Sequence, residues 1–192
     1  MRDVLDVVER MAGTIDHLRI FSRDTSEEPG VRFSVNDAIN GALKMIQSQL
    51  ANHGIALDLD LSGGVLPAMG HPHQMEQVFV NLLSNARDAL DEKEEGEGSF
   101  EKRIAIRTRV EKHDNWWVVA EVKDNGVGMD EEACQQVFEP FFTTKEAARG
   151  TGLGLSISYA IVQNHEGTIS CESCEGEGTT FRVAVPAAES RA

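Results

Sequence analysis

Apolar residues near the N-terminus repeat at the spacing of a helix that packs against another helix. Between residues 2 and 23 they are alternately four and three apart, from Val4 to Leu18, and charged residues fill the other face. We expect a helix from a dimeric bundle here, although packing on the chain's own body would give the same pattern. Residues 25–30 are polar and end in Pro-Gly, which predicts a linker.

The rest of the chain alternates between helical and strand-like patterns. Apolar positions at helical spacing predict helices at about 35–52, 71–90, 130–137 and 152–164. Alternating or short apolar runs predict strands at about 31–33, 55–61, 65–69, 103–111, 116–123, 167–173 and 179–185. Ser34 is the expected N-cap of the first of these helices and Gly54 its end. The acidic, glycine-containing residues 91–102 are predicted to form an exposed loop.

Composition changes this picture by excluding some classes of partner. The 192 residues include 18 basic and 32 acidic side chains, for a formal net charge of −14. Nucleic-acid binding needs clustered Lys and Arg, so we expect none. No apolar run is long enough for a membrane span, and acidic residues stand where a signal peptide would be apolar. We therefore expect a cytoplasmic protein, or the cytoplasmic part of a larger one.

Two of the three cysteines, Cys171 and Cys174, have C-x-x-C spacing. This spacing is that of a redox pair or half of a zinc site. The chain has no second C-x-x-C and no thioredoxin-like context. We therefore interpret them as two ordinary thiols in a strand and the turn after it.

A polar stripe interrupts the apolar surface of the helix predicted at 71–90. Gln77, Asn81, Asn85 and Asp88 are four, four and three residues apart, which places them on one face. Amide and carboxylate oxygens on one face suit Mg²⁺, which also takes phosphate oxygens. A polar stripe bonded to neighbouring loops would look the same.

The turn that follows the strand at 116–123 is the second candidate. Asp124 at a strand end can accept a hydrogen bond from an exocyclic amine, and Gly126 and Gly128 make room for a flat ring. Asp-Asn-Gly is also an ordinary signal for a sharp turn.

The third candidate is a glycine-rich helix start. Gly150, Gly152 and Gly154 precede the helix at 152–164, where free N–H groups and the helix dipole favour an anion. Lys145 and Arg149 flank this turn and could neutralise phosphate, or be solvated surface charges. Close packing of a glycine-rich helix start is the alternative for the glycines.

The order of these segments resembles that of the ATP-binding domain of sensor histidine kinases, within the ATPase superfamily that includes gyrase and Hsp90. QVFVNLLSNARDAL resembles the N box of that family, DNGVGM the G1 box, VFEPFFTTK the F box and GTGLGLSI the G2 box. GEGTTFRVAVP resembles its last strands. The resemblance covers about residues 31–187.

The resemblance implies an α+β fold: a two-layer α/β sandwich of the Bergerat type, with a mixed sheet and helices on one face. It implies that residues 1–24 are the second helix of a truncated dimerisation hairpin, through which the parent protein forms a homodimer, and that 188–192 are a tail. It makes 138–149 a lid that nucleotide binding orders. It assigns ATP binding to Asn81, Asn85, Asp88, Asp124, Gly126, Gly128, Met129, Phe138, Lys145, Arg149, Gly150, Thr151, Gly152, Leu153, Gly154, Leu155, Thr179 and Thr180, with Asn85 and Asn81 at Mg²⁺.

Two departures from the common family pattern matter. Asp88 stands where many members have Lys, a form similar to the nitrogen-regulation type, and this shifts phosphate neutralisation onto Lys145 and Arg149. Gyrase-like members have a Glu base at the position of Asn81, and Asn cannot take a proton, so we expect no rapid ATP hydrolysis. The second departure is the missing phosphoacceptor, because His17 lacks the context of an H box.

The implied function is transfer of the γ-phosphoryl group of ATP·Mg²⁺ to a histidine absent from this chain, and then to an aspartate of a response-regulator receiver domain. The chain alone should bind ATP and transfer nothing. The alternatives are a nucleotide-binding sensor module without phosphotransfer, a serine-kinase or anti-sigma-type relative, and a structural dimerisation fragment.

Overall fold

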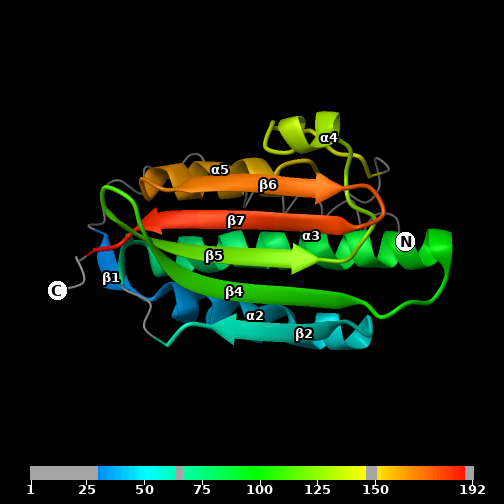
Figure 1. Ribbon diagram of the computed structural model, residues 1–192, viewed down its shortest axis with the longest axis horizontal. Helices are drawn as coiled ribbons and strands as arrows, with labels where there is room; N and C mark the ends of the chain where they lie inside the picture. The colour runs from blue at the N-terminus through cyan, green and yellow to red at the C-terminus, as the bar shows by residue number, and fades with distance from the viewer. Residues whose placement is uncertain (1–29, 64–66, 146–150, 189–192) are drawn as a thin grey trace, which may run out of the picture.

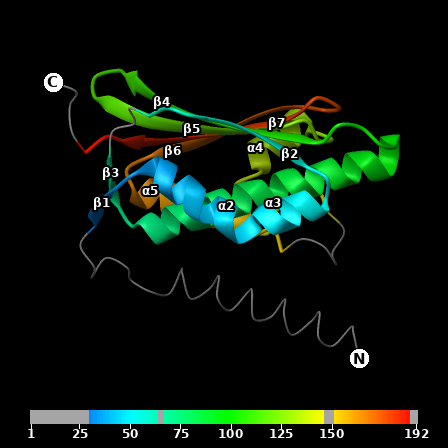
Figure 2. The ribbon, with the colours of Figure 1, turned by 90° about the horizontal axis from the view of Figure 1, so that it is seen from below.

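Five strands form one mixed sheet, and three helices cover one of its faces (Figures 1 and 2). The computed structural model describes residues 30–63, 67–145 and 151–188. The spatial order of the strands is β2 (Ala56–Leu61), β4 (Arg103–Lys112), β5 (Trp116–Asp124), β7 (Gly178–Pro186) and β6 (Thr168–Cys174). β2 is parallel to β4, and the other neighbours are antiparallel. The predicted helix at 2–23 and most of the predicted linker lie outside the described residues.

The helical layer consists of α2 (Val35–Asn52), α3 (Pro72–Glu97) and α5 (Gly154–Asn164). A short helix, α4 (Glu131–Gln136), lies beside β6, and a separate antiparallel pair joins β1 (Val31–Phe33) to β3 (Ala68–Gly70). These elements confirm the predicted α+β sandwich with a mixed sheet and helices on one face. None of the helices in the described part of the chain has the length and apolar character needed to cross a bilayer.

The core lies between this helical layer and the inner face of the sheet. α3 supplies its centre, because its apolar residues follow the helical period and are almost fully buried: Met75, Val78, Phe79, Leu82, Leu83, Ala86 and Leu90. Alternate residues of the central strands meet them, among them Ile104 and Ile106 of β4 and Val183 and Val185 of β7. One face of α3 is therefore committed to the core, and its polar stripe is turned aside.

The outer face of the sheet carries charges instead of a second helical layer. Arg109 lies 2.6 Å from Glu121 and 2.7 Å from Glu111, and Arg182 lies 2.6 Å from Glu111. Hydrogen bonding to Arg109 lowers the pKa of the Glu121 carboxyl, so the cluster stays ionised at neutral pH. These ion pairs, within β4 and between strands, keep the open face polar, which is what a two-layer architecture needs.

Local sequence signals set several element ends. Ser34 accepts a hydrogen bond from Asp37 N and caps α2, and Gly54, with a φ of 68°, follows that helix. His165 ends α5 and is buried: its Nδ1 lies 2.8 Å from Ile161 O, and its Nε2 accepts from His71 N. Burial lowers the pKa of His165, so its ring is neutral. The neutral ring joins the end of α5 to His71, the N-cap of α3.

The predicted loop at 91–102 is partly wrong, because α3 continues to Glu97. The acidic composition suggested solvent exposure, but Glu and Lys are good helix formers. This last part of the helix is also held by partners distant in the sequence. Lys102, only 5% exposed, places its Nζ 2.8 Å from Asp91 and 2.6 Å from Glu94. Lys93 donates to Gly176 O at 2.6 Å.

Truncation of two leucines compares a buried core position with an exposed edge position by the loss of stability at each. Leu83 in α3 is 0% exposed, whereas Leu59 in the edge strand β2 is 46% exposed. We expect Leu83→Ala to lower the free energy of unfolding by about 2–5 kcal/mol, because it leaves a cavity in the core. The matched Leu59→Ala should lower it by less than about 1 kcal/mol. Urea denaturation measures both, and equal losses would contradict this arrangement of the core.

Candidate functional site

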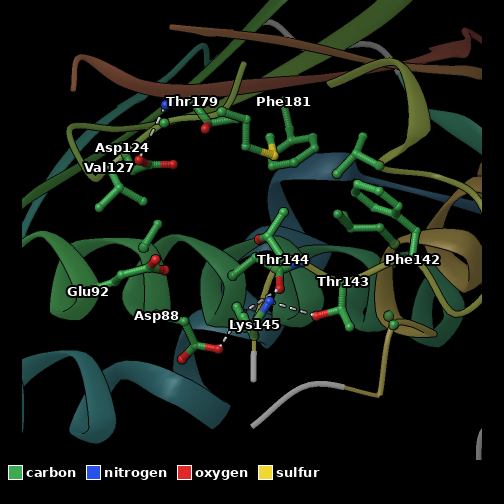
Figure 3. Close-up of a pocket in the computed structure, with 18 of the residues that line it drawn as sticks. Asp88, Glu92, Asp124, Val127, Phe142, Thr143, Thr144, Lys145, Thr179 and Phe181 are labelled. Atoms are coloured by element: carbon green, nitrogen blue, oxygen red, sulfur yellow. Dashed lines mark hydrogen bonds and ion pairs between the residues drawn. The ribbon is translucent and has the colours of Figure 1, made fainter. Parts of the chain in front are cut away.

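A cavity of about 290 Å³ lies between α3, the ends of β5 and β7, and the segment that follows α4 (Figure 3). Its lining residues come from every glycine-rich or polar segment that the sequence singled out. They are Asn85, Asp88, Ala89, Glu92, Asp124, Val127, Gly128, Met129, Val137, Phe142, Thr143, Thr144, Lys145, Thr151, Gly152, Gly154, Leu155, Thr179 and Phe181.

Asp124 is a buried acceptor at one end of the cavity. It is the last residue of β5 and is 3% exposed, and its Oδ1 accepts from Gly126 N at 2.8 Å and Thr179 N at 3.3 Å. Burial raises its pKa to about 6, although these hydrogen bonds and the charge of Lys93 favour the carboxylate. Both hydrogen bonds involve Oδ1, so Oδ2 is left to accept from an N–H group of a ligand (Figure 3).

The turn after Asp124 is held against its neighbours by backbone contacts. Gly128 has a φ of 69°, and its α-carbon lies against the carbonyl of Cys174, where a β-carbon would collide. Val127 N donates to Ala89 O of α3, and Val127 O accepts from Gly176 N at 2.6 Å. The turn therefore joins α3 to the β6–β7 turn and fixes this wall of the cavity.

A hydroxyl pair extends this wall to Thr179. Ser173 Oγ accepts from Met129 N at 2.8 Å and lies 2.9 Å from Thr179 Oγ1. The apolar side chains of Val127, Met129 and Phe181 also line this end of the cavity, so apolar walls surround one polar acceptor. Such walls suit a planar ring that carries an amine.

Charged and amide side chains of α3 lie at the other end of the cavity. Lys145 Nζ lies 2.6 Å from Asp88 Oδ2 and 3.5 Å from Asn85 Oδ1 (Figure 3). Asp88 is also bonded through Oδ1 to Arg87 at 2.6 Å. Lys145, which the resemblance assigns to phosphate, is thus already paired with Asp88.

The start of α5 completes this polar end. Gly152 has a φ of 65°, lies against the backbone of Phe141, and accepts from Phe141 N through its carbonyl at 2.9 Å. The helix begins at Gly154, and its N-cap, Leu153, provides no side-chain cap. The first N–H groups of α5 are therefore available to an anion at this end.

The structure brings eleven of the predicted site residues to the cavity wall: Asn85, Asp88, Asp124, Gly128, Met129, Lys145, Thr151, Gly152, Gly154, Leu155 and Thr179. Five others are not among its lining residues: Asn81, Gly126, Phe138, Leu153 and Thr180. Arg149 and Gly150 lie outside the described residues. Of the two threonines that the resemblance assigns to ATP binding, Thr179 lines the cavity and Thr180 does not, because neighbouring residues of a strand point to opposite faces.

Two of these five residues contact elements that line the cavity. Asn81 donates to Gly154 O at 3.0 Å and to Ser158 Oγ at 3.2 Å, and accepts from Gln77, so its amide joins α3 to α5 rather than lining the cavity. Phe138 packs its ring against Tyr159 and Phe181.

Eight lining residues are not among the predicted site residues: Ala89, Glu92, Val127, Val137, Phe142, Thr143, Thr144 and Phe181. Three of them, Phe142, Thr143 and Thr144, lie in the segment predicted to form the lid. Helical spacing from Asn85 reaches Ala89 within the predicted helix at 71–90, and it would have reached Glu92 if that helix had been extended past residue 90. Phe181 is two residues beyond Thr179 on one strand, so it shares that face.

The C-x-x-C cysteines do not pair with each other. Cys171 lies in β6, and Cys174 ends the same strand, so they point to opposite faces: Cys171 is half-buried and Cys174 exposed. Across the described residues, no group of three or more His, Cys, Asp or Glu side chains could hold a metal ion. Cys171 instead lies close to Cys134.

The two ends of the cavity together fit an adenine nucleotide. The buried acceptor and apolar walls suit the base, and the helix N-terminus, Lys145 and Asn85 suit phosphates. An amide oxygen beside a carboxylate also suits a hard cation such as Mg²⁺, which binds oxygen ligands and substrate phosphates.

Sequence comparison supports this interpretation. Residues 70–189 match the family described as histidine kinase-, DNA gyrase B-, and HSP90-like ATPase. The chain is 36% identical to the two-component sensor PprA of Pseudomonas aeruginosa, over 94% of this chain and 19% of that protein. It is 32% identical to the sensory histidine kinase/phosphatase NtrB of Rhizobium leguminosarum bv. phaseoli, over 98% of this chain and 49% of that protein. The chain thus spans less than half the length of these relatives.

Structural comparison agrees. The catalytic domain of histidine kinase ThkA superposes with a TM-score of 0.68 at 28% identity, over 83% of this chain and 97% of that one. The match of the family to more than half of the chain, together with this shared fold, shows that the chain belongs to the histidine kinase-, DNA gyrase B- and HSP90-like ATPases and carries the ATP-binding domain of sensor histidine kinases.

Proposed function

We propose that this chain binds ATP·Mg²⁺ in the 290 Å³ cavity and transfers the γ-phosphoryl group to a histidine on a separate helical hairpin. The observation that carries the proposal is the chemical difference between the two ends of the cavity. A buried carboxylate lies at one end, and a helix N-terminus with a lysine lies at the other. An adenine nucleotide has the matching arrangement of amine and phosphates.

At the base end, Asp124 accepts from the adenine amine through Oδ2, while Gly126 and Thr179 hold Oδ1. Val127 and Phe181 cover the faces of the ring. A carboxylate in this setting rejects a base with a carbonyl in place of the amine, because two acceptors would then face each other.

At the phosphate end, Asn85 is the proposed protein ligand of Mg²⁺, and the N–H groups of Gly152 and Gly154 bind phosphate oxygens. Bound Mg²⁺ neutralises charge on the phosphates. Lys145 leaves its ion pair with Asp88 and contacts phosphate, and residues 138–149 close as a lid. Asn81 fixes the position of Gly154 by donating a hydrogen bond to the Gly154 carbonyl. We therefore propose that Asn81 supports the site and does not contact the metal directly.

The chain contributes position and charge rather than a proton acceptor. The attacking group is the imidazole of the acceptor histidine, which needs no activation by this chain. Asn81 stands where gyrase-like members have a glutamate base, so water is poorly activated and ATP is kept for transfer.

The remaining roles concern the parent protein. We propose that residues 1–24 form part of a homodimeric hairpin, that 25–30 link it to the ATP-binding domain at 31–187, and that 188–192 are a tail. The phosphoryl group then passes to a receiver-domain aspartate, in the cytoplasm. The names of the relatives, a two-component sensor and a sensory histidine kinase/phosphatase, support this assignment.

Transfer in trans tests the proposed reaction. We expect the chain, mixed with γ-labelled ATP, Mg²⁺ and a separately supplied H-box hairpin, to give the hairpin an acid-labile label. Asn85→Ala should lower the labelling rate at least about tenfold, whereas Asn115→Ala, in the exposed β4–β5 hairpin, should leave it unchanged. Calorimetry first establishes ATP binding. Binding without label would indicate a nucleotide-sensing module, and an acid-stable label a serine kinase.

The buried carboxylate predicts how ATP affinity depends on pH. Asp124 in the free protein has a pKa of about 6, and binding of the amine needs the ionised form. As the pH falls through this value, ATP must displace a proton, so affinity should fall by roughly tenfold between pH 7 and pH 5. Asp124→Asn should bind ATP weakly and lack this component of the pH dependence. Calorimetric titration with ATP gives the affinity of both proteins at each pH, and the comparison between them removes the effect of the nucleotide's own ionisation. Parallel pH profiles of the two affinities would contradict the role of Asp124.

A further inference from the structure

One pair of thiols lies at contact distance between α4 and β6. Cys134 Sγ is 2.9 Å from Cys171 Sγ and 3.4 Å from Cys171 O. Cys134 belongs to α4 and Cys171 to β6, so the contact joins segments 37 residues apart (Figure 1). A disulfide has an S–S length of about 2.05 Å, so bond formation requires the two sulfurs to approach by roughly 0.9 Å.

We propose that Cys134 and Cys171 form a reversible intrachain disulfide that joins α4 to β6 and restrains the segment over the nucleotide cavity. Cys174 has no part in it, because it points to the opposite face of β6. The bond therefore differs from the one that the C-x-x-C spacing suggested.

The chemistry balances with a peroxide as oxidant. Hydrogen peroxide oxidises the Cys134 thiol to a sulfenic acid and releases one water. The Cys171 sulfur then attacks the sulfenic sulfur, and its thiol proton leaves with the hydroxyl group as a second water. Both thiols are partly accessible, so a small oxidant can reach them. A dithiol reductant restores them by exchange.

The position of the pair connects it to the cavity wall. α4 lies between the turn that contains Gly128 and the segment that starts at Val137, and Val137 lines the cavity. Cys171 is paired in register with Phe181, which lines the same cavity from β7. A covalent link at Cys134 would hold α4 in place between these two parts of the cavity wall. Any movement of the segment 138–145 would then begin at a helix that cannot shift.

We expect this restraint to slow nucleotide exchange. This half of the inference rests on the proposed function, whereas the disulfide itself does not. Oxidation should lower the dissociation rate of a fluorescent ATP analogue at least about threefold, because the lid segment must open for release.

Peptide mapping of the full chain tests the bond. After hydrogen peroxide and alkylation, we expect free thiols to fall from three to one per chain and one linked peptide pair to contain Cys134 and Cys171. Cys134→Ser and Cys171→Ser should abolish the link, and the matched Cys174→Ser should keep it. The oxidised wild type should melt roughly 5–10 °C higher than the reduced form.

Other results would overturn the proposal. A Cys171–Cys174 link, an interchain link, or retention of all three thiols would contradict the disulfide. An unchanged nucleotide dissociation rate in protein shown to carry the bond would contradict its regulatory effect. Failure of both redox forms to bind the analogue would count against the proposed nucleotide site and leave the bond as mapped.

Discussion

The buried carboxylate of Asp124 is the constraint on which the site depends. A carboxylate this deeply buried is costly unless its oxygens are paired, and the backbone N–H groups of Gly126 and Thr179 pair one of them. Those two donors come from the turn after β5 and from β7, so both segments must lie where they do for the acid to be tolerated. In the proposed function, the other oxygen accepts from the amine of the base.

Helix α3 organises the rest by using its faces for different purposes. One face is apolar and buries the centre of the core, while Asn85, Asp88 and Glu92 line the cavity. The C-terminal end of the helix reaches the opposite wall, where Lys93 donates to the carbonyls of Asn125 and Gly176. A single helix thus sets the position of the site relative to the core. The packing of its apolar face also stabilises the geometry of the cavity.

Much of this was predictable from the sequence because the signals were local. Periodicity gave the helices and strands, Ser34 and Gly54 marked the ends of α2, and the motifs located both ends of the cavity. Structural features that depend on tertiary partners could not be predicted. The end of α3 is held by Lys102 and by the Gly176 turn, and nothing local to residues 91–97 shows this. The contact of Cys134 with Cys171 is likewise tertiary, whereas the more visible C-x-x-C spacing lies on a strand that separates its two thiols.

Discrimination between ATP and ITP tests the role of the buried acceptor most directly, because the two nucleotides differ at the group that Asp124 would contact. Calorimetric titration with each nucleotide and Mg²⁺ at pH 7 should give an affinity for ITP at least about tenfold lower than for ATP, since the hypoxanthine carbonyl would face a carboxylate oxygen. Equal affinity for ATP and ITP would show that Asp124 does not read the base.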